Sequence, residues 1–174
     1  LYKGGTLKLA VAATGGGLKY TWYKGGSPIA GATDSAYIIP AVTNSDAGSY
    51  SVYVANSVGN ISNGPVAITI PNMASNSYAG SIISAGPEAW WRMDETAAST
   101  NMFDGMGRHD GLYTNAAGGA TLPTMGAAGA LIGDANTAVT FSSAGQGIGL
   151  APYSPAFGVN KSTIEAWVKT TVAT

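Results

Sequence analysis

The chain has 174 residues, of which 45% are hydrophobic and 10% are charged, and its formal net charge is −1. So apolar a composition excludes an intrinsically disordered protein, and the near-neutral charge excludes the basic surface of a nucleic-acid-binding protein. The chain has no cysteine, which excludes disulfides, thiol catalysis and zinc–thiolate sites. No apolar run approaches the roughly 20 residues of a membrane-spanning helix, so we expect no membrane insertion.

Hydrophobic residues alternate with polar ones through most of residues 1–71. A period of two indicates β-strands that bury one face. Turn clusters such as TGGG, KGGSP and TNSDAG separate the predicted strands, which contain the segments TLKLAVAAT, LKYTWYK, AYIIPAV, SYSVYVANS and PVAITI. Several short strands at this spacing predict an antiparallel β-sandwich.

A more specific pattern runs through the same segment. Its parts are Leu7-x-Leu9-x-Val11, Trp22-Tyr23-Lys24, and a long run from Tyr37-x-Ile39 to Asp46-x-Gly48-x-Tyr50-x-Val52. This pattern closely resembles an immunoglobulin-like domain of the intermediate type, and the resemblance covers almost all of residues 1–71. In that family a conserved tyrosine lies two residues before the second cysteine, which is the place of Tyr50 relative to Val52.

The resemblance implies that valines replace the family's disulfide. Val11 and Val52 occupy the two cysteine positions, so we expect them to meet in the core beside Trp22. Loss of a disulfide typically costs about 2–5 kcal/mol, and burial of a valine contributes roughly 1.5–3 kcal/mol, so a valine pair offsets much of the loss. The resemblance also implies structural roles for Trp22, Asp46 and Tyr50.

Residues 72–77 are predicted to be a short linker, and residues 78–174 a second domain. A short helix is predicted at its start, because Ser77 can cap it and Gly86-Pro87 can stop it. The segment EAWWRMDE alternates like a strand. Few strand signals follow between Asn101 and about Asp134, and TAVTFSS and STIEAWVKT are the remaining predicted strands.

The second segment resembles the N-terminal part of a laminin G-like domain. The resemblance is carried by the ordered blocks GPEAWWRMDE, FDGMGRHDGLY, GALIGDANTAVTFSSAGQGIGL and STIEAWVKT. It implies a partial concanavalin A-like jelly roll that lacks its later strands. The fold class that we predict is therefore all-β: an immunoglobulin-like β-sandwich followed by this partial jelly roll.

Two candidate sites lie in the second segment. Asp104 and Asp110 bracket a Gly-rich turn, and since many laminin G-like domains bind calcium in loops, these carboxylates are the candidate Ca²⁺ ligands. The alternative is a pair of solvated turn aspartates. In STIEAWVKT, Trp167 and Glu165 share one face, and an aromatic ring beside a polar group is typical of a carbohydrate contact. We expect no other cofactor.

Catalytic patterns are weak in this sequence. The single histidine, His109, lies in a Gly-rich loop, and no G-x-S-x-G motif accompanies it. Asp94 and Glu95 are neighbours, so on a strand they point to opposite faces and cannot form the paired acids of a glycosidase. We therefore predict no catalytic residues and no enzyme activity in this part of the chain.

We expect a non-catalytic adhesion or carbohydrate-binding segment of a larger extracellular or cell-surface protein, bacterial in origin. Its expected partner is a glycan or an extracellular protein, not nucleic acid. The chain begins at Leu1 and stops inside a strand-like pattern, which fits a segment of a longer protein. Two alternatives stay open: a structural spacer that positions a catalytic domain elsewhere, and part of a jelly-roll glycoside hydrolase whose acids lie beyond Thr174.

Overall fold

The structure is a computed structural model, which describes residues 1–96, 99–115, 121–129, 136–142 and 145–150, together with residues 163, 165, 166 and 168. The chain divides into two compact units, Leu1–Pro87 and Glu88–Thr174, and each is described by itself. Within the described residues, no helix is both long and apolar enough to span a membrane.

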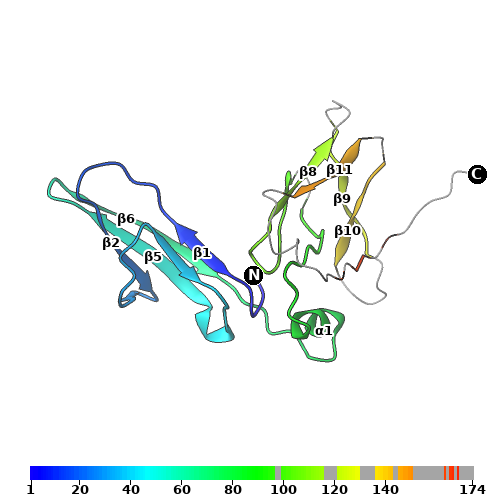
Figure 1. Cartoon of the computed structure of the whole chain (residues 1–174), viewed down its shortest axis with the longest axis horizontal. Coiled ribbons are helices and arrows are strands. Elements are labelled where there is room, and N and C mark those ends of the chain that lie inside the picture. Colours follow the sequence, from blue (N-terminus) through cyan, green and yellow to red (C-terminus); the bar gives the residue numbers. More distant parts are fainter. Residues whose placement is uncertain are drawn as a thin grey trace, which may run out of the picture. The chain divides into compact units, whose positions relative to one another are not determined.

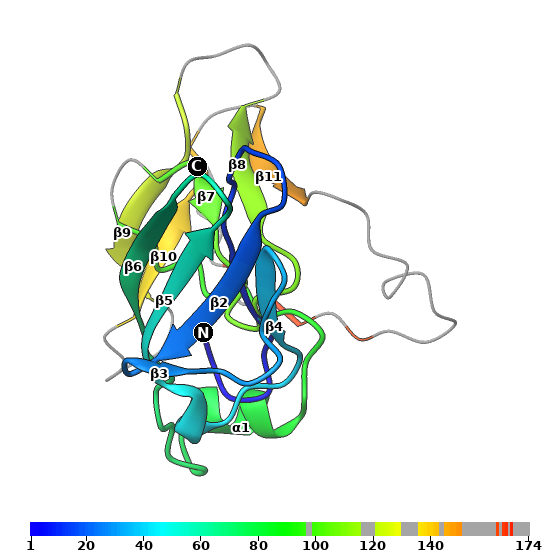
Figure 2. The same cartoon turned by 90° about the vertical axis from the view of Figure 1, so that its left-hand side faces the viewer.

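The first unit contains two antiparallel sheets that enclose its core (Figures 1 and 2). One sheet has four strands in the order β3-β2-β5-β6, and the other pairs β1 with β4. The bounds are β1 (Leu7–Ala10), β2 (Lys19–Lys24), β3 (Ser27–Pro28), β4 (Ala36–Ile39), β5 (Gly48–Ala55) and β6 (Asn60–Ile68). A short 3₁₀ helix (Asn44–Asp46) precedes β5. The antiparallel sandwich predicted for this segment is confirmed.

The core of the first unit follows the period-two pattern of its strands. Along β5, Tyr50, Val52 and Val54 are buried, while the residues between them are less so. Tyr50 joins a cluster with Leu7 of β1, and residues of β4 pack against that cluster. The two sheets therefore close on each other through the faces that the alternation predicts.

Strand β6 differs from the prediction. It begins at Asn60 rather than within PVAITI, and two of its large apolar side chains are exposed, Val66 by 46% and Ile61 by 67%. The reason is its place in the fold: β6 is the last strand of a four-stranded sheet, and the sheet opposite has two strands among the described residues. The side chains of β6 are therefore less buried by the opposite sheet than their alternation suggests.

The predicted helix is confirmed as α1 (Tyr78–Ser84), and its N-cap Ser77 accepts a hydrogen bond from the Gly80 N–H. The helix packs closely on the preceding segment, because a Cβ at Gly80 would lie 2.0 Å from the Ala74 carbonyl oxygen. The Ser77 hydroxyl also donates to that carbonyl at 2.6 Å. Residues 72–77 are thus tied to α1, which lies in the first compact unit, while the predicted linker and domain bounds stay predictions.

The second unit also consists of antiparallel strands. One sheet has the order β11-β8-β7 and the other pairs β10 with β9. The bounds are β7 (Asn101–Met102), β8 (Gly111–Asn115), β9 (Thr124–Ala128), β10 (Thr137–Thr140) and β11 (Gln146–Leu150). Among the described residues, the regular elements are mostly strands with little helix, as the all-β prediction requires.

Two predictions about strands in this unit are wrong. The segment EAWWRMDE forms no strand beyond an isolated bridge between Trp91 and Asp104, because Met93 has a φ of 56°, which an extended strand does not allow. Conversely, the Gly- and Ala-rich stretch after Asn101 holds β7, β8 and β9. The expected strand STIEAWVKT lies largely outside the described residues.

Candidate functional site

The structure brings Val11, Trp22 and Val52 into one hydrophobic cluster. Trp22 and Val52 are buried there with Val54, and the partly buried Val11 packs against them. The Trp22 indole N–H donates to the Asp34 carbonyl at 2.9 Å, so the ring is fixed at its polar end as well. Direct contact between the two valines stays a prediction, and the cluster that contains both supplies the packing expected in place of a disulfide.

Tyr50 and Asp46 form a hydrogen-bonded corner at the start of β5. The Tyr50 hydroxyl donates to the Asp46 carbonyl oxygen at 2.7 Å. The Asp46 carboxylate accepts the Thr43 N–H at 2.7 Å and the Thr43 hydroxyl at 2.8 Å. These two bonds lower the pKa of Asp46 from its usual value of 3.8, and burial raises the pKa of Tyr50 above 10.0. Both side chains thus hold a turn.

In the second unit, Asp104 is a buried carboxylate that organises a loop. Its Oδ1 accepts the N–H groups of Trp90 at 2.8 Å and Met106 at 2.9 Å. Its Oδ2 accepts the N–H groups of Arg108 and His109, each at 3.0 Å. Two oxygens offer about four lone-pair positions, so backbone donors occupy all of them.

The structure brings Asp110 next to Asp104 and joins the two by a hydrogen bond. The Asp110 carboxylate accepts the Asp104 backbone N–H at 2.9 Å. Among the described residues, no group of three or more His, Asp or Glu side chains is placed to hold a metal ion. Calcium needs six to eight oxygen ligands, and the Asp104 oxygens already serve the backbone. The hydrogen bonds give this pair a structural role, and calcium binding by it stays a prediction.

The acids near this loop also have defined partners. Glu95 Oε2 accepts the Tyr113 hydroxyl at 2.6 Å, and its Oε1 accepts the Phe103 N–H at 2.8 Å. Burial, followed by the bond to Glu95, raises the pKa of Tyr113. His109 Nε2 lies 2.8 Å from Glu88 Oε1, so the single histidine pairs with a surface glutamate.

The predicted carbohydrate contact is placed only in part. Glu165 is exposed, and Trp167 lies outside the described residues. The prediction that the two share one face therefore stays a prediction.

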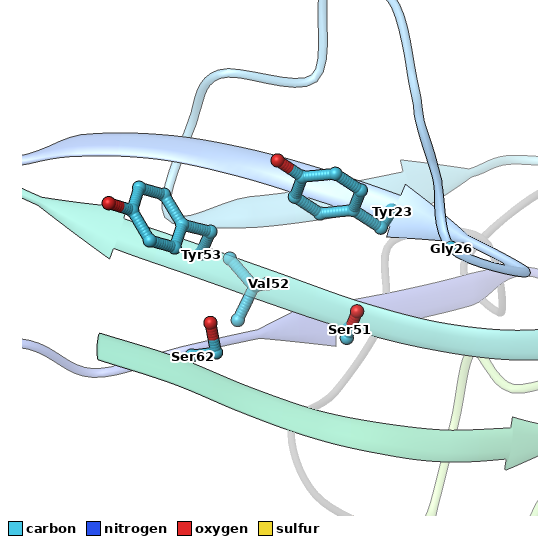
Figure 3. Close-up of a pocket in the computed structure, with 6 residues that line it drawn as sticks. All are labelled: Tyr23, Gly26, Ser51, Val52, Tyr53 and Ser62. Carbon is cyan, nitrogen blue, oxygen red and sulfur yellow. The ribbon is translucent and has the colours of Figure 1, made fainter. Parts of the chain in front are cut away.

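A different surface stands out on the four-stranded sheet of the first unit. A shallow hollow of about 240 Å³ lies on its outer face, lined by Tyr23, Gly26, Ser51, Val52, Tyr53 and Ser62. Figure 3 shows the Tyr23 and Tyr53 rings beside each other, with the hydroxyls of Ser51 and Ser62 nearby. We call the set Tyr23, Ser51, Tyr53 and Ser62 the tyrosine face.

Comparisons with known proteins match parts of the chain. The family described as "Immunoglobulin domain" matches residues 2–70. Residues 2–70 form an immunoglobulin-like domain. The "Decoration protein" of Escherichia phage T5 is 47% identical over 57 residues, which are 32% of this chain and 35% of that protein. The chain thus spans about a third of that relative's length.

Two solved structures resemble the chain over 40% of its length. The structure titled "Sidekick-1 immunoglobulin domains 1-5" is 27% identical in the matched region, which is 15% of that chain, with a TM-score of 0.38. The structure titled "Sidekick-1 immunoglobulin domains 1-4" is 29% identical over 19% of that chain, with a TM-score of 0.37.

Sequence reasoning overlooked the tyrosine face of the immunoglobulin-like domain. The signal was present: Tyr23 follows the buried Trp22, and Tyr53 lies between the buried Val52 and Val54. On a strand, neighbours of buried residues point to the opposite face. Two aromatic residues that the core does not require were therefore available as a surface feature.

Proposed function

We propose that this chain is a non-catalytic attachment segment of a larger extracellular or surface-exposed protein, with the immunoglobulin-like domain as its binding module. The observation that carries the proposal is the 47% identity over 57 residues to a phage decoration protein, by its name a component added to a surface. An immunoglobulin-like sandwich also suits this use, because its core fixes one sheet face and leaves the other free for contact.

The side-chain chemistry supports a binding role over hydrolysis. A glycosidase needs two carboxyl groups about 5–9 Å apart on either side of a substrate. In the described part of the second unit, the carboxylate oxygens of Asp104 and Glu95 accept hydrogen bonds from backbone N–H groups and from the Tyr113 hydroxyl. Glu88 is engaged with His109. These acids hold loops in place.

We further propose that residues 88–174 belong to a laminin G-like, concanavalin A-like domain, in which Trp167 and Glu165 contact carbohydrate. Two antiparallel sheets in this unit support the proposal, as jelly rolls are built from two such sheets. The test of this part is a chain extended through the remaining strands, whose sheet order a structure would reveal.

Attachment is tested with the full chain carrying a fluorescent label. We would measure its co-sedimentation with Escherichia cells and with particles of Escherichia phage T5. The matched control is the Val52→Asp chain, in which the immunoglobulin-like domain should be unfolded. Retention on cells or particles that the control lacks supports the proposal. Equal sedimentation of the two chains, or release of reducing ends from neutral polysaccharides, would contradict it.

A further inference from the structure

The tyrosine face is built by three neighbouring strands in fixed register. Tyr23 of β2 lies opposite Ser51 of β5, and Tyr53 of β5 lies opposite Ser62 of β6. Residues opposite each other in an antiparallel pair project to the same side of the sheet. Ser51 and Tyr53, two apart on one strand, also share a side. The backbone ladder therefore places two phenol rings and two hydroxyls on one surface.

These side chains are not needed by the core. The residues that alternate with them, Trp22, Tyr50, Val52 and Val54, are the buried ones. Tyr23 and Tyr53 remain partly exposed on the outer side, beside the hollow of about 240 Å³. Drug-sized ligands occupy pockets of about 300–1,000 Å³, so this shallow hollow suits one ring of a longer ligand.

The chemistry of the lining selects the ligand class. The rings present apolar faces with a negative quadrupole, against which polarised C–H groups pack favourably. The four hydroxyls both donate and accept hydrogen bonds. No residue that lines the hollow is charged, so an anionic ligand would gain no charge partner there. A ligand that matches this lining has apolar C–H faces, several hydroxyls and no charge. A neutral sugar has all three properties.

We propose that the tyrosine face binds a neutral saccharide, with one pyranose ring against Tyr23 and Tyr53 and its hydroxyls bonded to Ser51, Ser62 and the phenol groups. This inference rests on the proposed attachment function and names its ligand. It assigns the contact to the immunoglobulin-like domain, separate from Trp167 and Glu165.

The test measures binding of the labelled full chain to a glycan array that carries neutral hexose and N-acetylhexosamine oligosaccharides beside sialylated and sulfated ones. We expect binding to neutral glycans. Tyr53→Ala and Tyr23→Ala should each weaken it at least tenfold, and Tyr53→Phe, which keeps the ring, should weaken it less. Ser49→Ala is the matched control, because Ser49 lies on the outer side of β5 but does not line the hollow, and it should bind normally. Circular dichroism melts would show that each variant is folded.

Several results would overturn the proposal. They are an absence of binding to neutral glycans, stronger binding to anionic ones, and neutral binding that the double variant Tyr23→Ala/Tyr53→Ala retains. Cell attachment that the double variant loses, but that periodate oxidation of the cell glycans leaves intact, would indicate a protein partner instead. If the double variant still attaches to cells, the saccharide site on the tyrosine face is refuted and the attachment function is not. If the parent chain binds neutral glycans but does not attach to cells, the attachment function is refuted and the saccharide site is not.

Discussion

At the scale of single residues, Asp46 and Asp104 do the same work in different units. The Asp46 carboxylate accepts the N–H and the hydroxyl of Thr43, and the Asp104 carboxylate accepts four backbone N–H groups. Asp46 was predicted to be structural from its place before Tyr50, since the family pattern fixes both. For Asp104 the sequence indicates a polar loop but not whether the side chain is buried. An aspartate in a Gly-rich turn has the same local pattern whether its carboxylate points into the protein or into solvent.

Asp104→Asn is expected to destabilise the second unit by at least about 2 kcal/mol. Whichever way the amide is turned, its NH₂ faces two N–H donors, and each buried donor left unsatisfied costs about 1–3 kcal/mol. The measurement is hydrogen exchange of Gly111–Asn115, which reports on this unit alone. Asp110→Asn is the control, because its amide oxygen can still accept the Asp104 N–H, and it should cost less than about 1 kcal/mol. Equal protection in the Asp104→Asn and parent chains would refute the role assigned to Asp104.

The lowered pKa of Asp46 predicts that the stability of the first unit depends on pH. Its pKa is lower in the folded protein than its usual value of 3.8, so its stabilising effect is complete above that value and is lost as the pH falls through the folded pKa. Thermal melts of the first unit should therefore drop in midpoint below about pH 4. In Asp46→Asn the drop should be shallower than in the parent, because the amide does not titrate. A profile unchanged in Asp46→Asn would contradict this assignment.

At the scale of elements, alternation located the strands that bury large side chains. It found β1, β2, β4 and β5 because Leu, Trp, Tyr and Val mark their inner faces. It missed β9, whose sequence TMGAA has Met125 as its one large apolar side chain; its pairing with β10 comes from the backbone ladder. It also placed a strand at EAWWRMDE, where the positive φ of Met93 interrupts the extended chain. A positive φ cannot be predicted from hydrophobic alternation, and a strand of mostly small residues shows too little alternation to be recognised.

Strand β5 offers a direct test of its two faces. Val52→Asp should unfold the immunoglobulin-like domain, because Val52 is 4% exposed and an unpaired buried charge costs more than the several kcal/mol by which small domains are stable. Ser49→Asp adds the same carboxylate three residues away on the exposed face, and we expect a change within about 0.5 kcal/mol. Near-ultraviolet circular dichroism through a thermal melt measures both. A cooperative melt of Val52→Asp at the parent temperature would show that Val52 is not in the core.

At the scale of the whole molecule, the two units differ in how their apolar residues are gathered. Both hydrophobic clusters of buried residues seen in the described part of the chain belong to the first unit. The second unit buries Met102, Met106 and Tyr113 and relies on Asp104 and Glu95 to fix its loops. Apolar burial is the main favourable term in folding, so the first unit should be the more stable of the two.

Hydrogen exchange on the full chain is the test of that difference. Amides of β2 and β5 should be the slowest, exchanging only on unfolding of the first unit, while amides of β8 should exchange at a smaller opening free energy. The Val52→Asp chain sharpens the test, because it removes the core of one unit only. If each unit folds around its own buried residues, protection in β2 and β5 disappears in this variant and protection in Gly111–Asn115 stays at the parent level. Equal protection of β5 and β8 in the parent chain, or their joint loss in the variant, would show one cooperative structure, in which case the second unit draws its stability from more than the residues described in it.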